Sequence, residues 1–136
     1  MGKTYTVETL DSKDISSKVI PEPYNRSLQL ILDKTDGDNV GDFTFLLSTL
    51  FPYEGKTDYH THPVDELIFI CSGYGHSVDE NGEKTPLKAG SVIYAKAEKK
   101  HQCVNESPET MRMACIYIPA LPEELVKKIR SKCGIS

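Results

Sequence analysis

The chain has 136 residues, a formal net charge of -4 at pH 7, 38% hydrophobic residues and 26% charged residues. This length suits one domain with a continuous core, and the composition is that of an ordinary globular protein rather than a disordered or fibrous one. The acidic balance argues against a nucleic-acid partner, because neutralising phosphates requires a basic surface.

The first part of the chain, residues 1–23, is polar and ends at Pro21 and Pro23, so we expect an extended N-terminal arm. In residues 24–120 short apolar runs alternate with clusters of Gly, Asn, Asp and Pro, which predicts seven or eight β-strands. Many short strands with no helical segment between them favour an antiparallel sandwich or barrel. The Asn-Gly pair of 80-ENGE-83 predicts a type I′ hairpin turn.

Residues 121–136 contain the helical signals of this chain. Pro122 and two glutamates stand at the start, basic residues follow, and Gly134 stands near the end. We therefore expect a C-terminal helix that packs on the barrel through one apolar face. The residues of that face are Leu125, Val126, Ile129 and Cys133.

The four cysteines, at positions 71, 103, 115 and 133, form no CxxC pair and no dense disulfide framework. We interpret them as reduced thiols. The first twenty residues lack the apolar segment of a signal peptide, and no apolar stretch approaches the ~20 residues of a membrane span. These features predict a cytoplasmic location and no membrane partner.

The stretch 59-YHTHPVDELIFI-70 places polar side chains next to an apolar run. Successive side chains of a strand alternate between its faces, so His60 and His62 project in the same direction and can converge on one point. Glu66 begins the next strand, and Ile68 shares its face. Three polar groups in an apolar interior are costly unless a partner satisfies them, and a divalent metal is such a partner.

His101, in 101-HQCVN-105, is a fourth candidate ligand. The spacing of these residues resembles the two motifs of the cupin superfamily. Departures from the usual pattern are four residues between Gly55 and His60 instead of five, and alanines at 95 and 97 in place of Pro and Gly. The residues that carry the resemblance are Gly55, His60, His62, Glu66 and Gly73 in the first motif, and Leu87, Gly90, His101 and Asn105 in the second.

The resemblance implies an all-β fold, a double-stranded β-helix (jelly-roll) barrel with a short C-terminal helix. It also implies one divalent transition metal per chain, Fe, Mn, Ni, Zn or Cu, inside the barrel. The implied ligands are His60, His62, Glu66 and His101. We interpret Asn105 as a structural hydrogen-bonding residue near the site and His76 as a structural residue.

A metal held by four protein ligands in six-fold coordination keeps two positions for a ligand, which favours a metal-dependent enzyme acting on a small, polar, oxygen-rich molecule. Oxygenase, isomerase and lyase chemistry all fall within this class. The alternative is a non-catalytic module that binds or senses a small molecule. Tyr94 is the candidate acid-base residue, and Cys103 a second candidate inner group. Arg26 and Arg112 are candidates for contact with a carboxylate or phosphate.

The strand in 66-ELIFICS-72 has apolar residues on both faces: Leu67 and Phe69 on one, Ile68 and Ile70 on the other. The C-terminal helix can cover part of the face that points away from the core, and a partner subunit must cover the rest. We therefore predict a homodimer, in which the N-terminal arm is exchanged between the two subunits.

Overall fold

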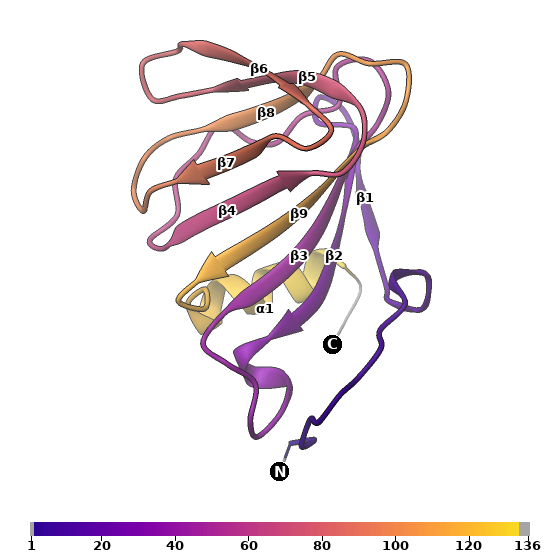
Figure 1. Ribbon diagram of the computed structural model, residues 1–136, viewed down its shortest axis with the longest axis vertical. Helices are drawn as coiled ribbons and strands as arrows, with labels where there is room; N and C mark the ends of the chain where they lie inside the picture. The colour runs from indigo at the N-terminus through magenta and orange to yellow at the C-terminus, as the bar shows by residue number, and fades with distance from the viewer. Residues whose placement is uncertain (1, 134–136) are drawn as a thin grey trace.

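The structure, a computed structural model, describes residues 2–133. That range forms nine strands, one C-terminal α-helix and two short 3-10 helices (Figure 1). In chain order the elements are η1 (Ser12–Asp14), β1 (Lys18–Ile20), β2 (Arg26–Asp33), η2 (Lys34–Asp36), β3 (Thr44–Leu50), β4 (Asp65–Ile70), β5 (Tyr74–Val78), β6 (Lys84–Lys88), β7 (Val92–Ala95), β8 (Gln102–Asn105), β9 (Met111–Ile118) and α1 (Glu123–Lys132).

The strands form two antiparallel sheets. The larger has the order β1-β2-β3-β9-β4-β7 and the smaller the order β6-β5-β8. In β3 and β9 every second side chain is buried, as the period of two in a strand requires when one face meets a core. The core lies between the sheets, and its most buried members are Leu50, Ile70, Met111 and Met113.

The structure has strands in two places where the sequence pattern did not separate or predict them. Residues 83–97 form β6 and β7, because Gly90 at φ 96° turns the chain between them. The arm contributes β1, which pairs with β2, and the 3-10 turn η1, so it is not extended throughout. The start of the arm lies against its own chain, where Tyr5 N donates to Asn39 Oδ1 at 2.8 Å.

The hairpin between β5 and β6 is not a type I′ turn. Such a turn needs a positive φ at both central residues, and here Gly82 has a positive φ of 78° while Asn81 does not. The Asp79 carboxylate accepts the backbone N–H groups of Asn81 and Glu83, each at 2.9 Å. These hydrogen bonds stabilise a turn in which Gly82 has a positive φ and Asn81 does not.

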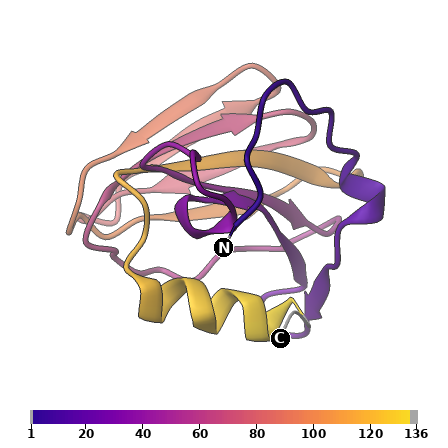
Figure 2. The ribbon, with the colours of Figure 1, turned by 90° about the horizontal axis from the view of Figure 1, so that it is seen from below.

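Helix α1 crosses one side of the barrel, close to β2 (Figure 2). Val126 is buried in the core and Leu125 and Ile129 pack against it, as the apolar face predicted. Arg130 Nη2 lies 2.9 Å from Asp36 Oδ1 and joins the helix to η2. The expected stop residue Gly134 lies outside the described residues.

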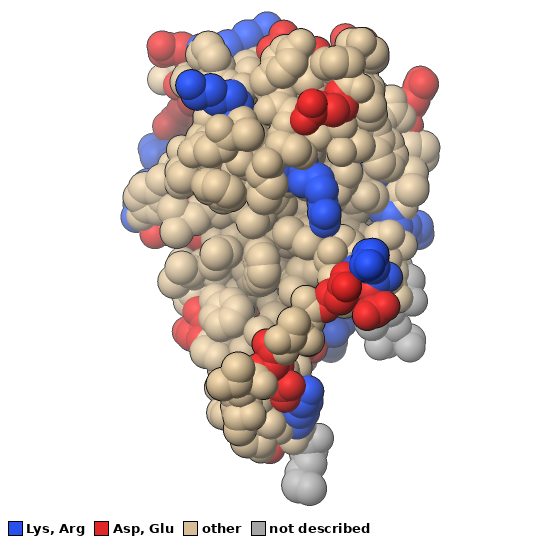
Figure 3. All heavy atoms as spheres, turned by 45° about the vertical axis from the view of Figure 1, so that its right-hand side comes forward, with Lys and Arg blue, Asp and Glu red and all other residues tan. Residues whose placement is uncertain are grey.

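The surface in Figure 3 carries acidic and basic side chains scattered among uncharged ones. Among residues 2–133 no helix is long and apolar enough to cross a membrane.

Candidate metal centre

The two histidine segments are neighbours in the fold. His60 and His101 form an antiparallel bridge in which His60 N donates to His101 O at 3.2 Å and His101 N donates to His60 O at 3.1 Å. Nearer the start of this segment, Lys56 pairs with Val104 in β8. The segment of residues 55–60 therefore runs along β8, and this pairing brings the first and second motifs together.

Asn105 fixes the far end of this pairing. Its N–H donates to Gly55 O at 2.8 Å, and its side chain, which is fully buried, donates to backbone carbonyls. Nδ2 donates to Leu50 O and Phe51 O, each at 3.1 Å, and to Glu109 O at 2.8 Å. The geometry places Asn105 as a positioning residue for the loops around the site.

Glu66 lies in β4, between β7 and β9, and is 3% exposed. Its Oε1 is 2.9 Å from Nε2 of His62 and 3.1 Å from Nε2 of His101. The His62 nitrogen is not aligned for a hydrogen bond at this distance. It is one of two buried polar side-chain atoms in the described part of the chain without a hydrogen-bond partner.

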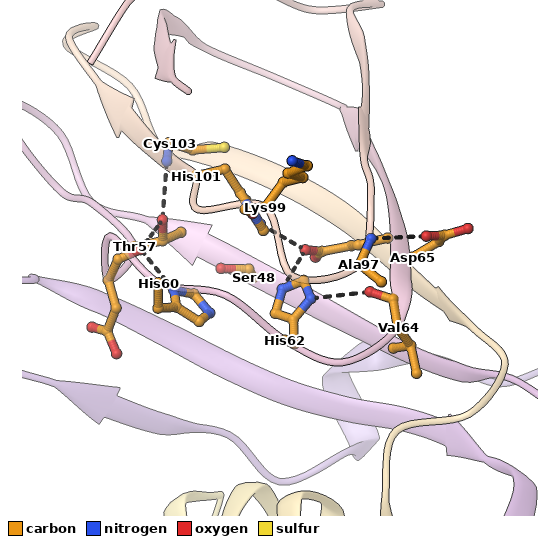
Figure 4. Close-up of polar contacts among 12 residues, drawn as sticks. Ser48, Thr57, His60, His62, Val64, Asp65, Ala97, Lys99, His101 and Cys103 are labelled. Atoms are coloured by element: carbon orange, nitrogen blue, oxygen red, sulfur yellow. Dashed lines mark hydrogen bonds and ion pairs between the residues drawn. The ribbon is translucent and has the colours of Figure 1, made fainter. Parts of the chain in front are cut away.

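The other ring nitrogen of each imidazole faces a backbone carbonyl (Figure 4). A carbonyl can only accept, so each Nδ1 carries a proton, and each Nε2 is the ring nitrogen that a metal could bind. For His60, His62 and His101 the acceptors are Asp58 O at 2.8 Å, Val64 O at 3.4 Å and Lys99 O at 2.9 Å respectively.

The ligand atoms of His62, Glu66 and His101 lie within 4.8 Å of one another, a spacing at which they could share one ion. His60 is not part of this group of ligand atoms, but its ring is a neighbour, with its centroid 5.2 Å from that of His62 and 5.7 Å from that of His101. Three imidazole nitrogens and one carboxylate oxygen are donors that first-row transition metals accept. The residues present fit a metal.

The charges of the group also favour a cation. Burial raises the pKa of Glu66, but its contacts with His101 and His62 outweigh burial and lower the pKa to about 2. Burial lowers the pKa of His101, but its contacts with Glu66 and Lys99 O raise it overall. Burial lowers the pKa of His60. Glu66 is thus a buried anion beside two imidazoles, and its charge favours a cation at this point.

A cavity of about 200 Å³ opens at the four predicted ligands. This is room for a small organic molecule, because one water needs only about 10–15 Å³ on this measure. Its walls come from the barrel interior and from α1, which contributes Leu125, Lys128 and Ile129. Barrel residues in the wall include Arg26, Ser48, Thr57, Cys103, Cys115 and Tyr117.

Several wall groups stay protonated. Burial raises the pKa of the Cys103 thiol to about 12, and burial also raises the pKa of Cys115 and of Tyr117 well above their usual values. Cys103 is therefore an inner group, as its position predicted, but a thiol rather than a thiolate. The Tyr117 ring meets His62 edge-on at 4.9 Å between centroids.

Tyr94 lies outside this cavity. Its side chain is 58% exposed, and its hydroxyl donates to Asp65 Oδ2 at 2.9 Å, so the structure gives no support to its interpretation as an inner catalytic group. Its neighbours Ile93 and Ala95 take the inward positions of β7. Tyr117 is the tyrosine of the cavity wall, and the prediction missed it.

Arg112, another candidate, and His76, interpreted as a structural residue, also lie away from the cavity. Arg112, half-buried, is opposite Thr49 and is not among the residues of the wall. His76 lies in β5, with Nδ1 3.0 Å from Glu106 Oε1. Arg26, in contrast, lines the cavity.

Comparisons with known proteins give one family and several related folds. The cupin domain family matches residues 47–117. L-ectoine synthase of Vibrio campbellii is 30% identical over 118 residues, which cover 85% of this chain and 86% of the synthase.

Two solved structures share the fold, and at their low identity they show the fold alone. A predicted oxalate decarboxylase from Thermotoga maritima has a TM-score of 0.71 and 22% identity, over 82% of this chain and 99% of the other. The polyketide cyclase RemF from Streptomyces resistomycificus has a TM-score of 0.69 and 19% identity, over 82% of this chain and 79% of the other. These likenesses confirm the double-stranded β-helix.

Proposed function

This chain belongs to the cupin family, and from that premise we propose that it is a metal-dependent enzyme acting on a small, polar, oxygen-rich molecule. The substrate binds in the barrel cavity, at a mononuclear centre held by His60, His62, Glu66 and His101. The reaction falls in the oxygenase, isomerase or lyase range.

One observation carries the proposal: the orientation of the three imidazoles. Each directs Nδ1 to a backbone carbonyl and so keeps Nε2 for a ligand. A buried nitrogen without a partner is costly, and a metal would give the Nε2 of His62 its missing partner. Carbonyls that fix the imidazole tautomer in this way are typical of metal-binding histidines.

The names of the relatives support an enzyme. The curated relative is named as a synthase, and one structural neighbour as a cyclase. Each of these activities is a property of the relative. For this chain they favour catalysis on a small molecule.

The cavity walls suit such a role. A metal bound at the centre supplies Lewis acidity and an open position for a substrate oxygen. The Tyr117 hydroxyl stays protonated and can donate a hydrogen bond to a substrate. Leu125 and Ile129 of α1 form an apolar side of the cavity, which limits water beside the substrate.

The same walls also favour the alternative, a non-catalytic module that binds a small molecule. Cys103, Cys115 and Tyr117 all hold their protons, so none of them is a ready general base. An enzyme would then draw its general base from Asp58, the remaining acid in the wall. Conversion of a small molecule separates the two functions, because a sensor binds its ligand unchanged.

Elemental analysis of protein purified without chelator tests the centre. We expect one equivalent of a transition metal per chain, and less than about a tenth of that in Glu66→Gln, because the amide removes the only anionic ligand. Glu106→Gln is the matched control, since Glu106 pairs with His76 outside the cavity. A metal-free wild type, or full metal content in Glu66→Gln, would contradict the proposal.

The metal-loaded protein should then be incubated with hydroxy acids, diketones and sugar phosphates, and the mixtures followed by NMR. Turnover of one of them, absent in Glu66→Gln, supports the enzyme. Thermal stabilisation by a compound that remains intact supports the binding module.

A further inference from the structure

A buried arginine shares the cavity with the proposed metal ligands. Arg26 is the first residue of β2 and is 9% exposed. It pairs with Leu50 of β3 on the inward face, and its guanidinium lines the cavity. Nη2 donates to Ser48 Oγ at 2.8 Å.

A second nitrogen of this guanidinium has no partner. Nε is the second of the two buried polar atoms without a hydrogen-bond partner in residues 2–133. No carboxylate of the described chain lies within ion-pair distance of Arg26, and Ser48 is neutral. An arginine presents five N–H donors and cannot lose its charge, so burying it without an anion is costly.

Neither acid of the cavity wall, Glu66 or Asp58, forms an ion pair with Arg26. Glu66 is already engaged by His62 and His101, and a divalent ion at the centre would leave that group with a net positive charge. Lys128 of α1 adds a further positive charge to the wall. An anionic group on a molecule that enters the cavity would balance the charge of Arg26.

We propose that Arg26 binds an oxyanionic group, a carboxylate or a phosphate, of the molecule that occupies this cavity. A guanidinium matches such groups in a two-pronged geometry, and this explains why one edge of Arg26 is left without a protein partner. The inference rests on the proposed function in one respect: it specifies the substrate as an anion, held by Arg26 at one end and by the metal centre at the other.

Isothermal titration with malonate, inorganic phosphate and neutral malonamide tests this assignment, on metal-loaded and on chelator-treated protein. We expect malonate or phosphate to bind the wild type, and malonamide to bind at least about tenfold more weakly, because a charge-assisted hydrogen bond exceeds a neutral one. Comparison of malonate with phosphate identifies which oxyanion fits.

The variants are Arg26→Met, Arg26→Lys and, as a matched control, Arg112→Met on the outward side of β9. Arg26→Met should weaken the binding of the better anion at least about tenfold, with metal content unchanged. Arg26→Lys should show an intermediate loss, because it keeps the charge and loses the planar fork. Arg112→Met should stay within about twofold of the wild type.

Unchanged anion affinity in Arg26→Met, or no anion binding to the wild type in either metal state, would overturn the inference. If Arg26→Met does not fold, Arg26→Lys decides, and wild-type affinity in that variant overturns it. Anion binding that depends on Arg26 in a chain that takes up no metal would sustain this inference and refute the metal-dependent function.

Discussion

His60 and His101 stand directly opposite each other, 41 positions apart in the chain, with each backbone N–H bonded to the carbonyl of the other. Two backbone hydrogen bonds therefore fix the separation of two proposed ligands before any metal arrives. Glu66 and His62 complete the group from the adjoining turn and β4. Such preorganisation lowers the entropy that binding has to remove.

His101→Ala and His60→Ala should each weaken metal binding at least about tenfold, since even the loss of a supporting group costs 10–100-fold. His101→Ala should have the larger effect, because His101 also bonds Glu66. Titration against a competing chelator measures both affinities. His76→Ala is the control, and an equal loss in that variant would show that the effect is one of general stability.

Asn105→Ala should destabilise the fold by about 2–4 kcal/mol, because it leaves buried carbonyls and the N–H of Ser107 without their partner. Urea unfolding of the metal-free protein measures the change. Asn81→Ala, in an exposed turn, should stay within about 0.5 kcal/mol of the wild type. Similar losses in the two variants would contradict the structural role of Asn105.

Spacing along a strand made much of the site predictable. His60 and His62 share a direction because alternate residues do, and Glu66 shares a face with the buried Ile68. The family resemblance supplied His101, which no local pattern connects to the others. The pairing of residues 55–60 with β8 is a long-range contact, and its partner cannot be read from either segment alone.

The inward face of a strand is harder to predict when both faces are apolar. In 92-VIYA-95 no charged residue marks the outside, so the orientation of Tyr94 could not be derived from its strand. In β9 a signal existed: Arg112 marks the outward set, which leaves Tyr117 with the inward one. Nothing in the sequence indicated that Arg26 would be buried, because arginine is usually exposed.

The outer face of the larger sheet carries two apolar rows that cross several strands. Leu67 and Phe69 of β4 are 39% and 47% exposed, and Val92 and Tyr94 of β7 are 62% and 58% exposed. Partly buried neighbours extend the rows onto β3 and β9. The register pairs Phe45 with Ile116, Ile116 with Leu67, and Leu67 with Tyr94 in one row, and Leu47 with Ala114, Ala114 with Phe69, and Phe69 with Val92 in the other.

A continuous apolar face of this kind favours the predicted homodimer, which therefore remains our expectation. Sedimentation velocity should show a dimer for the wild type and a monomer for Phe69→Asp, because a charge at the centre of the interface must be desolvated. Tyr74→Asp, on the other sheet in β5, should leave the dimer intact. A monomeric wild type would remove the prediction.

Asp33 is a buried acid far along β2 from Arg26, and it joins three segments. It is 1% exposed, and its carboxylate accepts hydrogen bonds from the hydroxyl of Thr44 at 2.6 Å and from the hydroxyl and N–H of Thr35 at 2.6 and 3.0 Å. Burial raises the pKa of Asp33, but these hydrogen bonds outweigh it and hold the pKa below its usual value.

A carboxyl whose pKa is lowered by folding stabilises the protein fully above its unfolded pKa of about 3.9, and this contribution is lost as the pH falls through the lower folded value. Asp33→Asn should therefore lower the free energy of unfolding by about 1–3 kcal/mol near neutral pH. The difference in the free energy of unfolding between wild type and variant should narrow below about pH 4.

Glu66, which also titrates at low pH, is present in both proteins, so its contribution cancels in this difference. Urea unfolding of both metal-free proteins across this range measures the gap, with the exposed Asp14→Asn as the variant that should track the wild type. A gap that persists unchanged in acid would mean that Asp33 stabilises the fold without its charge.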